Sequence, residues 1–342
     1  ALRPHTDWSL TQVLSSDPAA QEQAFHRVDI VQPALFAMGV ALSRVWQSLG
    51  ISPRAVVGHS QGEIAAACVA GALSLKDAAQ VVAVRSRLLR ACAGRGTMAT
   101  VGLPVAEAQQ RIARFGGRLS VAAVNSLTST VIAGEMGAVR ELLAELLQHG
   151  IFHREIAVDY ASHSAEVDPV LAQLRRELDG LRPQAATVGI ASTVEGQLLA
   201  GDRLDAGYWA RNLREPVRLD RAVEALCKAG YGTFLEISAH PQLLVPLAEL
   251  VGETSLIVGS LRRGEGPARL LTSALELVVG GHEIDWTAAL GRRGKMTSLP
   301  TYAFRRQRYW LDESRAGDAE GLGLKRWEHP LLASRTSLPS PE

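Results

Sequence analysis

The chain has 342 residues, 47% of them hydrophobic, and a formal net charge of +1. This is enough for one large domain or two smaller ones with buried cores, and the near-neutral charge argues against nucleic acid as a partner. The three cysteines are too scattered for a disulfide framework, and the histidines form no metal motif. No run of about 18 apolar residues stands out, so we expect a cytoplasmic protein with no metal and no membrane partner.

The first ninety residues predict helices around one short strand. Helical patterning covers residues 17–49, with a break expected at Gln32-Pro33 because proline lacks the amide hydrogen that a helix uses. A β-rich run at residues 55–57 leads into a glycine-rich turn. The helices expected next cover residues 62–72 and about 75–92, the second capped by Ser74.

Residues 97–159 have a pattern of their own. The order of expected elements is β-α-β-β-α-β, which is the ferredoxin-like arrangement. We therefore expect a small subdomain inserted into a larger α/β body. The strands are predicted at 98–103, 119–125, 130–134 and 151–158, and the helices at 104–115 and 137–149.

The larger body is expected to resume at residue 160. Alternating strands and helices favour a mostly parallel sheet with covered faces, here as an α/β-hydrolase-like subdomain made of residues 1–96 and 160–283. Its later strands are predicted at 187–192, 233–237 and 256–259, and its helices at 164–180, 205–213, 217–229, 241–251 and 267–280.

The last sixty residues change character. Residues 284–313 read as a linker, in which the stretch 299–310 combines Tyr, Phe and Trp with arginines. Solvated tails are poor in aromatic residues, so we expect this stretch to pack as an irregular belt on another surface. Residues 314–342 begin as a linker rich in glycine and charged residues.

Residues 58–62 read Gly-His-Ser-Gln-Gly between the predicted strand and helix, which is the context of a nucleophile elbow. The two glycines would let strand and helix approach closely around a strained turn that exposes the Ser60 hydroxyl. The backbone N–H of Gln61 would point to the place where an oxyanion forms. Ser60 is therefore the predicted nucleophile.

Two further residues are candidates for the same chemistry. His163 lies between a predicted strand and helix, where a base for Ser60 could sit, although a lone histidine in a loop is usually just solvated. Arg85 has apolar neighbours in its helix and needs a planar anion, either a bound carboxylate or an internal Asp or Glu. No glycine-rich nucleotide motif follows a strand, so we expect no nucleotide cofactor.

Several motifs together resemble the acyltransferase domain of modular type I polyketide synthases, which is similar to malonyl-CoA:acyl carrier protein transacylases. The resemblance covers about residues 1–313. Besides Arg85, found 25 residues after Ser60, it rests on the runs at 27–33, 58–63, 160–163, 208–209, 212–217, 236–241 and 299–310.

The resemblance implies a Ser–His dyad. Ser60 would take the acyl group from a CoA thioester, and His163 would act as general base and then as general acid. Main-chain carbonyls would orient the imidazole in place of an acidic third member. The loop at 238–241, which contains His240, is the expected source of one such carbonyl.

The resemblance also implies substrate-binding roles. Arg85 would clamp the free carboxylate of an extender unit, and Gln61 would offer its backbone N–H to the oxyanion. Gln32 and Asn125 would line the pocket.

The run at residues 160–163 bears on the identity of the extender unit. Tyr160 and Ser162 in Tyr-Ala-Ser-His resemble the form associated with methylmalonyl-CoA, because a small Ser162 leaves room for the α-methyl group. Malonyl-CoA is the other candidate donor. The acceptor would be the phosphopantetheine thiol of an acyl carrier protein, with no bound cofactor, and ketosynthase and dehydratase domains would flank this one.

The chain departs from the family at both ends. A first strand and a Gly-Gln-Gly-Ser-Gln motif, which supplies a second oxyanion donor, would precede Ala1, so we expect a truncated domain. The run at 329–332 resembles the start of a dehydratase domain. Two other functions remain open: an α/β-hydrolase-type esterase or thioesterase, and a catalytically inactive scaffold segment of a megasynthase.

Overall fold

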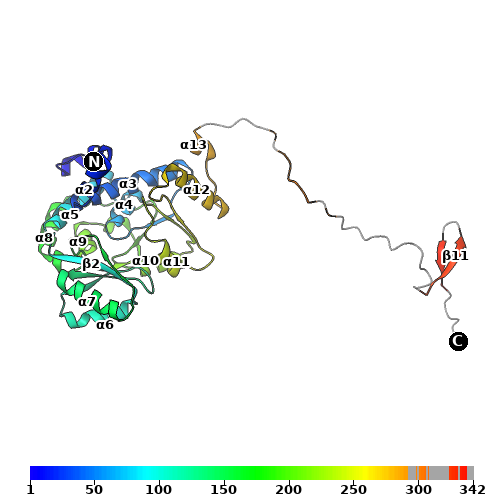
Figure 1. Cartoon of the computed structure of the whole chain (residues 1–342). Helices are drawn as coiled ribbons and strands as arrows, with labels where there is room; N and C mark the ends of the chain where they lie inside the picture. Colours follow the sequence, from blue (N-terminus) through cyan, green and yellow to red (C-terminus); the bar gives the residue numbers. More distant parts are fainter. Residues whose placement is uncertain (292–297, 299, 306, 308–322, 330–331, 337–342) are drawn as a thin grey trace. The chain divides into compact units, whose positions relative to one another are not determined.

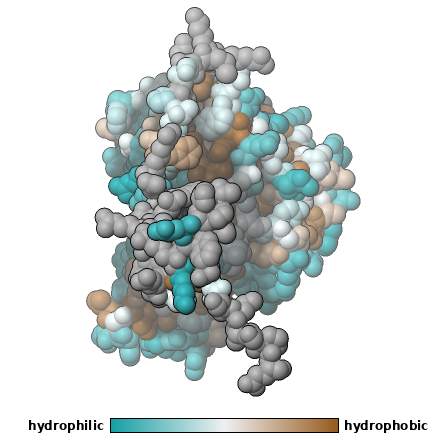
Figure 2. Space-filling view, turned by 90° about the vertical axis from the view of Figure 1, so that its right-hand side faces the viewer, coloured by the Kyte–Doolittle hydropathy of each residue, from teal (hydrophilic) through white to brown (hydrophobic). Residues whose placement is uncertain are grey.

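The computed structural model describes residues 1–291, 298, 300–305, 307, 323–329 and 332–336. The chain divides into two units, Ala1–Arg293 and Gly294–Glu342. The first unit contains the helices and sheets that position the site (Figure 1). Figure 2 shows one face of the molecule, on which hydrophilic and hydrophobic residues are mixed.

The long helix α3 (Val28–Ser48) is continuous, so the break expected at Pro33 is wrong. Proline removes one backbone hydrogen bond, but the buried side chains of Phe36 and Trp46 further along hold the helix against the core. α3 is also long and apolar enough to cross a membrane, yet half of that stretch is buried, as in a core helix. It is preceded by η1 (Arg3–His5), α1 (Leu10–Ser15) and α2 (Pro18–Phe25).

Two helices pack against α3 and carry residues of the site. α4 (Gly62–Val69) follows the elbow and is three residues shorter than expected, while α5 (Leu75–Arg90) begins at its predicted cap. Ser74 caps α5 by accepting a hydrogen bond from the backbone N–H of Asp77.

The strands of the larger body form two short sheets and not the one sheet expected. β1 (Ala55–Val57) pairs in parallel with β6 (Gly189–Ser192), which pairs antiparallel with β7 (Gln197–Leu199). β9 (Thr233–Glu236) and β10 (Leu256–Gly259) form a separate parallel pair. The helices around these sheets are α8 (Asp168–Leu178), α9 (Ala206–Arg214), α10 (Leu219–Lys228), α11 (Leu244–Leu250), α12 (Gly266–Val279) and α13 (Trp286–Leu290), with η3 (Ala165–Val167) and η4 (Gly201–Arg203).

The ferredoxin-like prediction is confirmed by the strand order β5-β2-β4-β3 with antiparallel pairs throughout. A fifth strand, β8 (Val217–Arg218), joins β3 in parallel, although the sequence there predicted the start of a helix. The other elements are β2 (Gly96–Val101), α6 (Val105–Ile112), η2 (Ala113–Phe115), β3 (Leu119–Val124), β4 (Thr130–Glu135), α7 (Met136–Gln148) and β5 (His153–Ile156).

The two faces of this sheet are buried differently. Helices α6 and α7 cover one face, where large residues such as Ile132 and Leu146 form a core of their own (Figure 1). The other face is lined with small residues, including Ala122 and Ala133, which pack against Ala161. Small side chains allow a close approach there, which places the segment after β5 beside the elbow.

The second unit is described only in part. β11 (Lys325–His329) and β12 (Leu332–Arg335) pair antiparallel, and the rings of Tyr302 and Phe304 meet edge to face with centroids 5.0 Å apart. The predicted belt includes residues 299, 306 and 308–310, which lie outside the described residues, so its packing stays a prediction. Residues 314–322 of the linker expected to begin at 314, and residues 330–331 of the dehydratase-like run, also lie outside the described residues.

Adjacent leucines of α7 test how far the ferredoxin-like core contributes to stability. Leu146 is fully buried and Leu147 is 69% exposed. We expect Leu146→Ala to lower the free energy of unfolding by about 2–5 kcal/mol because it leaves a cavity, and Leu147→Ala to change it by less than about 0.5 kcal/mol. Urea unfolding measures both. Equal effects would contradict the packing described.

Candidate active site

Ser60 stands at the tip of a strained turn between β1 and α4. Its backbone φ is 53°, in the left-handed region that residues with a side chain rarely adopt. A Cβ on Gly58 would lie 2.2 Å from the backbone of Glu63, so only glycine fits there. A Cβ on Gly62 would meet nothing within 4 Å, so the expectation that both glycines permit a close approach holds only for Gly58.

Ser60 and His163 lie within hydrogen-bonding distance although 103 residues separate them in the chain. The Oγ of Ser60 is 2.7 Å from Nε2 of His163, and Nδ1 of the same ring is 2.8 Å from the main-chain carbonyl oxygen of Glu215. A carbonyl can only accept, so Nδ1 carries the proton and Nε2 is free to accept the Ser60 hydroxyl proton. The geometry is that of a nucleophile with its base.

The imidazole of His163 is held in its neutral form. Burial, and next the positive charge of Arg85, lower its pKa to about 3. His163 is therefore uncharged at neutral pH, which is the state that a general base requires.

The carbonyl that orients His163 does not come from the loop expected to supply it. The acceptor is Glu215, just after α9, and the backbone N–H of His163 also donates to the carbonyl of Leu213. His240 is exposed, and its Nδ1 accepts from the backbone N–H of Arg263 instead. The assignment of His240 and the loop at 238–241 is therefore wrong, because the end of α9 packs against His163.

Arg85 is a buried cation beside the nucleophile. It is 1% exposed, and its Nη2 donates to Ser60 Oγ at 3.2 Å while its Nη1 donates to Gln32 Oε1 at 2.6 Å. Its Nε has no partner, and among the described residues no carboxylate pairs with it. Burial lowers its pKa to about 10, so it stays charged at neutral pH. Of the two anions considered, the internal carboxylate is not found in the described part of the chain.

The two predicted specificity residues are placed differently. The hydroxyl of Tyr160 accepts from Gln32 Nε2 at 3.3 Å, which connects it through Gln32 to Arg85. Ser162 is buried, and its hydroxyl lies 3.5 Å from the sulfur of Met98 on β2. Tyr160 is thus part of the hydrogen-bonded site, whereas the contact of Ser162 is with the sheet beneath it.

Gln61 and Asn125 both lie next to the elbow. The backbone N–H of Gln61, at the N-terminus of α4, has no acceptor among the described residues and is available to an oxyanion. Its side-chain Oε1 is also buried without a partner. The side chain of Asn125 bonds to the elbow through His59: its Oδ1 lies 2.7 Å from His59 Nε2.

Sequence reasoning assigned no role to a carboxyl group buried beneath Ser60. Glu63 is fully buried on α4 and accepts hydrogen bonds from Tyr208, Thr193 and Asn212. Burial raises its pKa to about 7. The available signal was a carboxylate in an otherwise apolar helix, Gly-Glu-Ile-Ala-Ala-Ala, one turn after the nucleophile.

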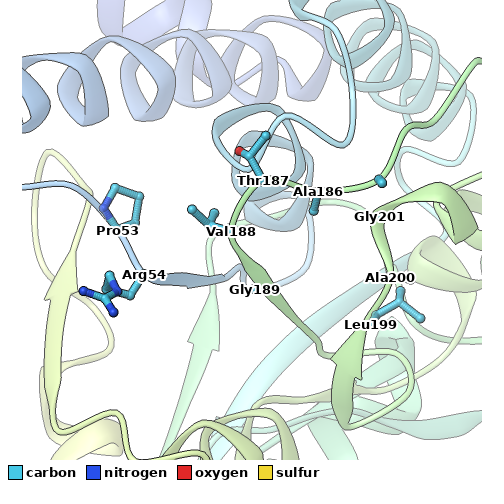
Figure 3. Close-up of a pocket in the computed structure, with 10 residues that line it drawn as sticks. Pro53, Arg54, Ala186, Thr187, Val188, Gly189, Leu199, Ala200 and Gly201 are labelled. Carbon is cyan, nitrogen blue, oxygen red and sulfur yellow. The ribbon is translucent and has the colours of Figure 1, made fainter.

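A cavity of about 540 Å³ lies elsewhere in the first unit (Figure 3). Pro53 and Arg54 before β1 and Thr187 and Val188 before β6 line it, so it opens at the amino ends of these strands. Ser60 follows the carboxyl end of β1, where ligands of parallel sheets bind. The described residues also contain no group of side chains suited to a metal ion.

Comparison with known proteins identifies the family to which the chain belongs. Residues 1–284 match the model of the acyl transferase domain. The chain is 49% identical over 349 residues to the spectinabilin polyketide synthase system protein NorA' of Streptomyces orinoci, covering all of this chain but only 10% of that protein. The chain therefore spans about a tenth of the length of that relative.

Solved structures give the same result. The acyltransferase domain from module 8 of the salinomycin polyketide synthase is 46% identical with a TM-score of 0.80, over 84% of this chain and 68% of that one. The acyl transferase domain of SpnD, in complex with 2-(pent-4-yn-1-yl)malonyl, is 29% identical with a TM-score of 0.71. The match covers 82% of this chain and 67% of that one. The chain belongs to the acyl transferase domain family and is an acyltransferase domain of the polyketide synthase type.

Proposed function

We propose that this domain transfers a carboxylated extender unit from a CoA thioester, through an ester on Ser60, to the phosphopantetheine thiol of an acyl carrier protein. The observation that carries the proposal is Arg85, a buried cation 3.2 Å from the nucleophile with an unpartnered Nε. A guanidinium in that position is suited to a substrate carboxylate.

The first half-reaction follows from the dyad. His163 Nε2 takes the hydroxyl proton of Ser60 as Oγ attacks the thioester carbonyl, and the Gln61 N–H stabilises the resulting oxyanion. When the tetrahedral intermediate collapses, the carbon–sulfur bond breaks and the leaving thiolate takes the proton from His163. The product is an acyl ester on Ser60.

In the second half-reaction the acceptor thiol is the nucleophile and Ser60 is the leaving group. His163 removes the proton of the acceptor thiol, whose sulfur attacks the ester carbonyl, and the Ser60 oxygen leaves and recovers the proton. The CoA thioester enters as a substrate and free CoA leaves as a product, while the described residues supply the nucleophile, the base and one oxyanion donor.

We propose methylmalonyl as the extender unit in preference to malonyl. The support is the Tyr-Ala-Ser-His run at 160–163, together with the connection from Tyr160 through Gln32 to Arg85. The acyl group in the complex of the SpnD domain, 2-(pent-4-yn-1-yl)malonyl, is substituted at the carbon that would carry the proposed methyl group. One methyl group is worth about 1–3 kcal/mol in an apolar pocket.

Hydrolysis is the main alternative for the same elbow. An esterase or thioesterase would admit water to the Ser60 ester, whereas a transferase must exclude it until a thiol arrives. The buried cation favours transfer of a carboxylated acyl group, since a hydrolase acting on simple esters has no need of it. The third possibility, a scaffold segment, requires no reaction at Ser60.

Mass spectrometry of the Ser60 peptide tests the proposal. After exposure to a mixture of methylmalonyl-, malonyl- and acetyl-CoA, we expect a methylmalonyl ester on Ser60 that disappears when pantetheine or carrier protein is added. Ser60→Ala should give no adduct. An unmodified wild-type peptide would support the scaffold, and rapid loss to water without thiol would support the hydrolase.

Arg85→Ala tests the carboxylate clamp. We expect it to slow loading from methylmalonyl-CoA by about 100-fold or more and to remove the preference over acetyl-CoA, because a partner worth about 3–5 kcal/mol is lost. Arg87→Ala is the matched control, since Arg87 lies on the same helix but is half exposed and pairs with Glu177. Unchanged donor preference in a competition assay would refute the clamp.

The double variant Tyr160→His with Ser162→Phe tests extender selectivity. We expect the ratio of methylmalonyl to malonyl loading to fall by about 10-fold, since the larger side chain takes the space for one methyl group. Tyr160→Phe, which removes only the hydroxyl that accepts from Gln32, is the control for that contact. If the mass of the loaded acyl group stays the same in the double variant, this assignment fails.

A further inference from the structure

The dyad depends on two elements that are far apart in the chain. Ser60 belongs to the turn before α4, whereas His163 is held by main-chain carbonyls at the end of α9, those of Leu213 and Glu215. The 2.7 Å distance between Ser60 Oγ and His163 Nε2 therefore depends on the position of α4 relative to α9. A side chain that connects α4 to α9 would therefore control the distance between Ser60 and His163.

Glu63 makes that connection. Its Oε1 accepts from the hydroxyl of Tyr208, and its Oε2 accepts from Asn212 Nδ2 at 3.0 Å. Tyr208 and Asn212 are four residues apart on α9, so they lie on one face of that helix, directed at Glu63. The residue after Asn212 supplies one of the two carbonyls that hold His163.

The protons of this network can be assigned. Ser192 Oγ accepts from the backbone N–H groups of Val194 and Glu195, so its own O–H donates to the oxygen of Tyr208, 2.6 Å away. The hydroxyl proton of Tyr208 is then left for Glu63. The carboxyl group of Glu63 thus acts as an acceptor toward α9.

The network also reaches the nucleophile itself. The carbonyl of Ser60 accepts from the backbone N–H of Glu63 at 3.1 Å and from Asn212 Nδ2 at 3.4 Å. Asn212 therefore contacts both Glu63 and the strained residue of the elbow. Thr193 also donates to Glu63, at 2.7 Å, but it lies after β6 and is not part of α9.

We propose that Glu63 is a positioning residue, which sets the distance between Ser60 and His163 by binding Tyr208 and Asn212 of α9. The inference deepens the proposed function and rests on it, since it takes the Ser60–His163 pair as the reacting groups. Glu63 does not touch the substrate and acts through α9.

Two isosteric variants separate positioning from simple stabilisation. Tyr208→Phe and Thr193→Val each remove one hydroxyl that donates to Glu63, but only Tyr208 belongs to α9. The readout is the rate at which a fluorophosphonate probe labels Ser60, alongside the midpoint of thermal unfolding. We expect both variants to lose thermal stability, Tyr208→Phe more so because it also leaves the Ser192 hydroxyl without its acceptor. Labelling should become about 10-fold slower or more only for Tyr208→Phe, because small misplacements of reacting groups are costly.

Equal labelling rates for the two variants would overturn the inference. If Tyr208→Phe does not fold, Glu63→Gln provides the test, since it keeps the size of the side chain and loses an acceptor. It should lower the maximal labelling rate while leaving the half-saturating probe concentration unchanged; a change in the latter alone would refute positioning. If the wild-type protein reacts with the probe but takes no acyl group from CoA thioesters, the proposed transfer function is refuted. The comparison of labelling rates between the variants still tests the positioning role of Glu63.

Discussion

The hydrogen bond between Ser60 and His163 is the contact on which the rest of the site depends. It joins a turn after β1 to a loop after β5, with the whole ferredoxin-like sheet between them in the chain. The small residues on one face of that sheet let the loop return close to the elbow, and the end of α9 holds the ring in the required tautomer. A strained backbone at both residues, with φ of 53° and 61°, is maintained because these contacts surround it.

Burial gives the three charged or titratable groups around this bond different roles. It keeps His163 neutral and so able to accept a proton, it leaves Arg85 charged at neutral pH, and it raises the pKa of Glu63 to about 7. Arg85 contributes twice, since its charge helps to lower the pKa of His163 and its free donor is available to a carboxylate. In the proposed function, the desolvation that makes an unpaired cation costly is also the source of the selectivity for a carboxylated donor.

Local patterns in the sequence were sufficient for much of the fold. The ferredoxin-like order could be predicted because each element has its own periodicity and length, and the elbow because strand, turn and helix are adjacent in the chain. Local patterns did not predict the uninterrupted helix at Pro33, since its stability comes from packing, or the two-residue strand β8, which exists only because β3 lies beside it. They also did not predict that the strands of the larger body form two sheets.

The sequence by itself determined which residues are candidates for the proposed chemistry: the serine in its elbow, a histidine at a strand-to-helix junction and an arginine in an apolar helix. Only the tertiary structure decided how they are supported. The carbonyl that orients His163 belongs to Glu215 and not to the loop near His240, and a main-chain carbonyl has no signature in the sequence because every residue has one. Likewise Glu63 is recognisable as a helix residue, but its contacts with Tyr208 and Asn212, about 145 residues away, exist only once α9 packs on α4.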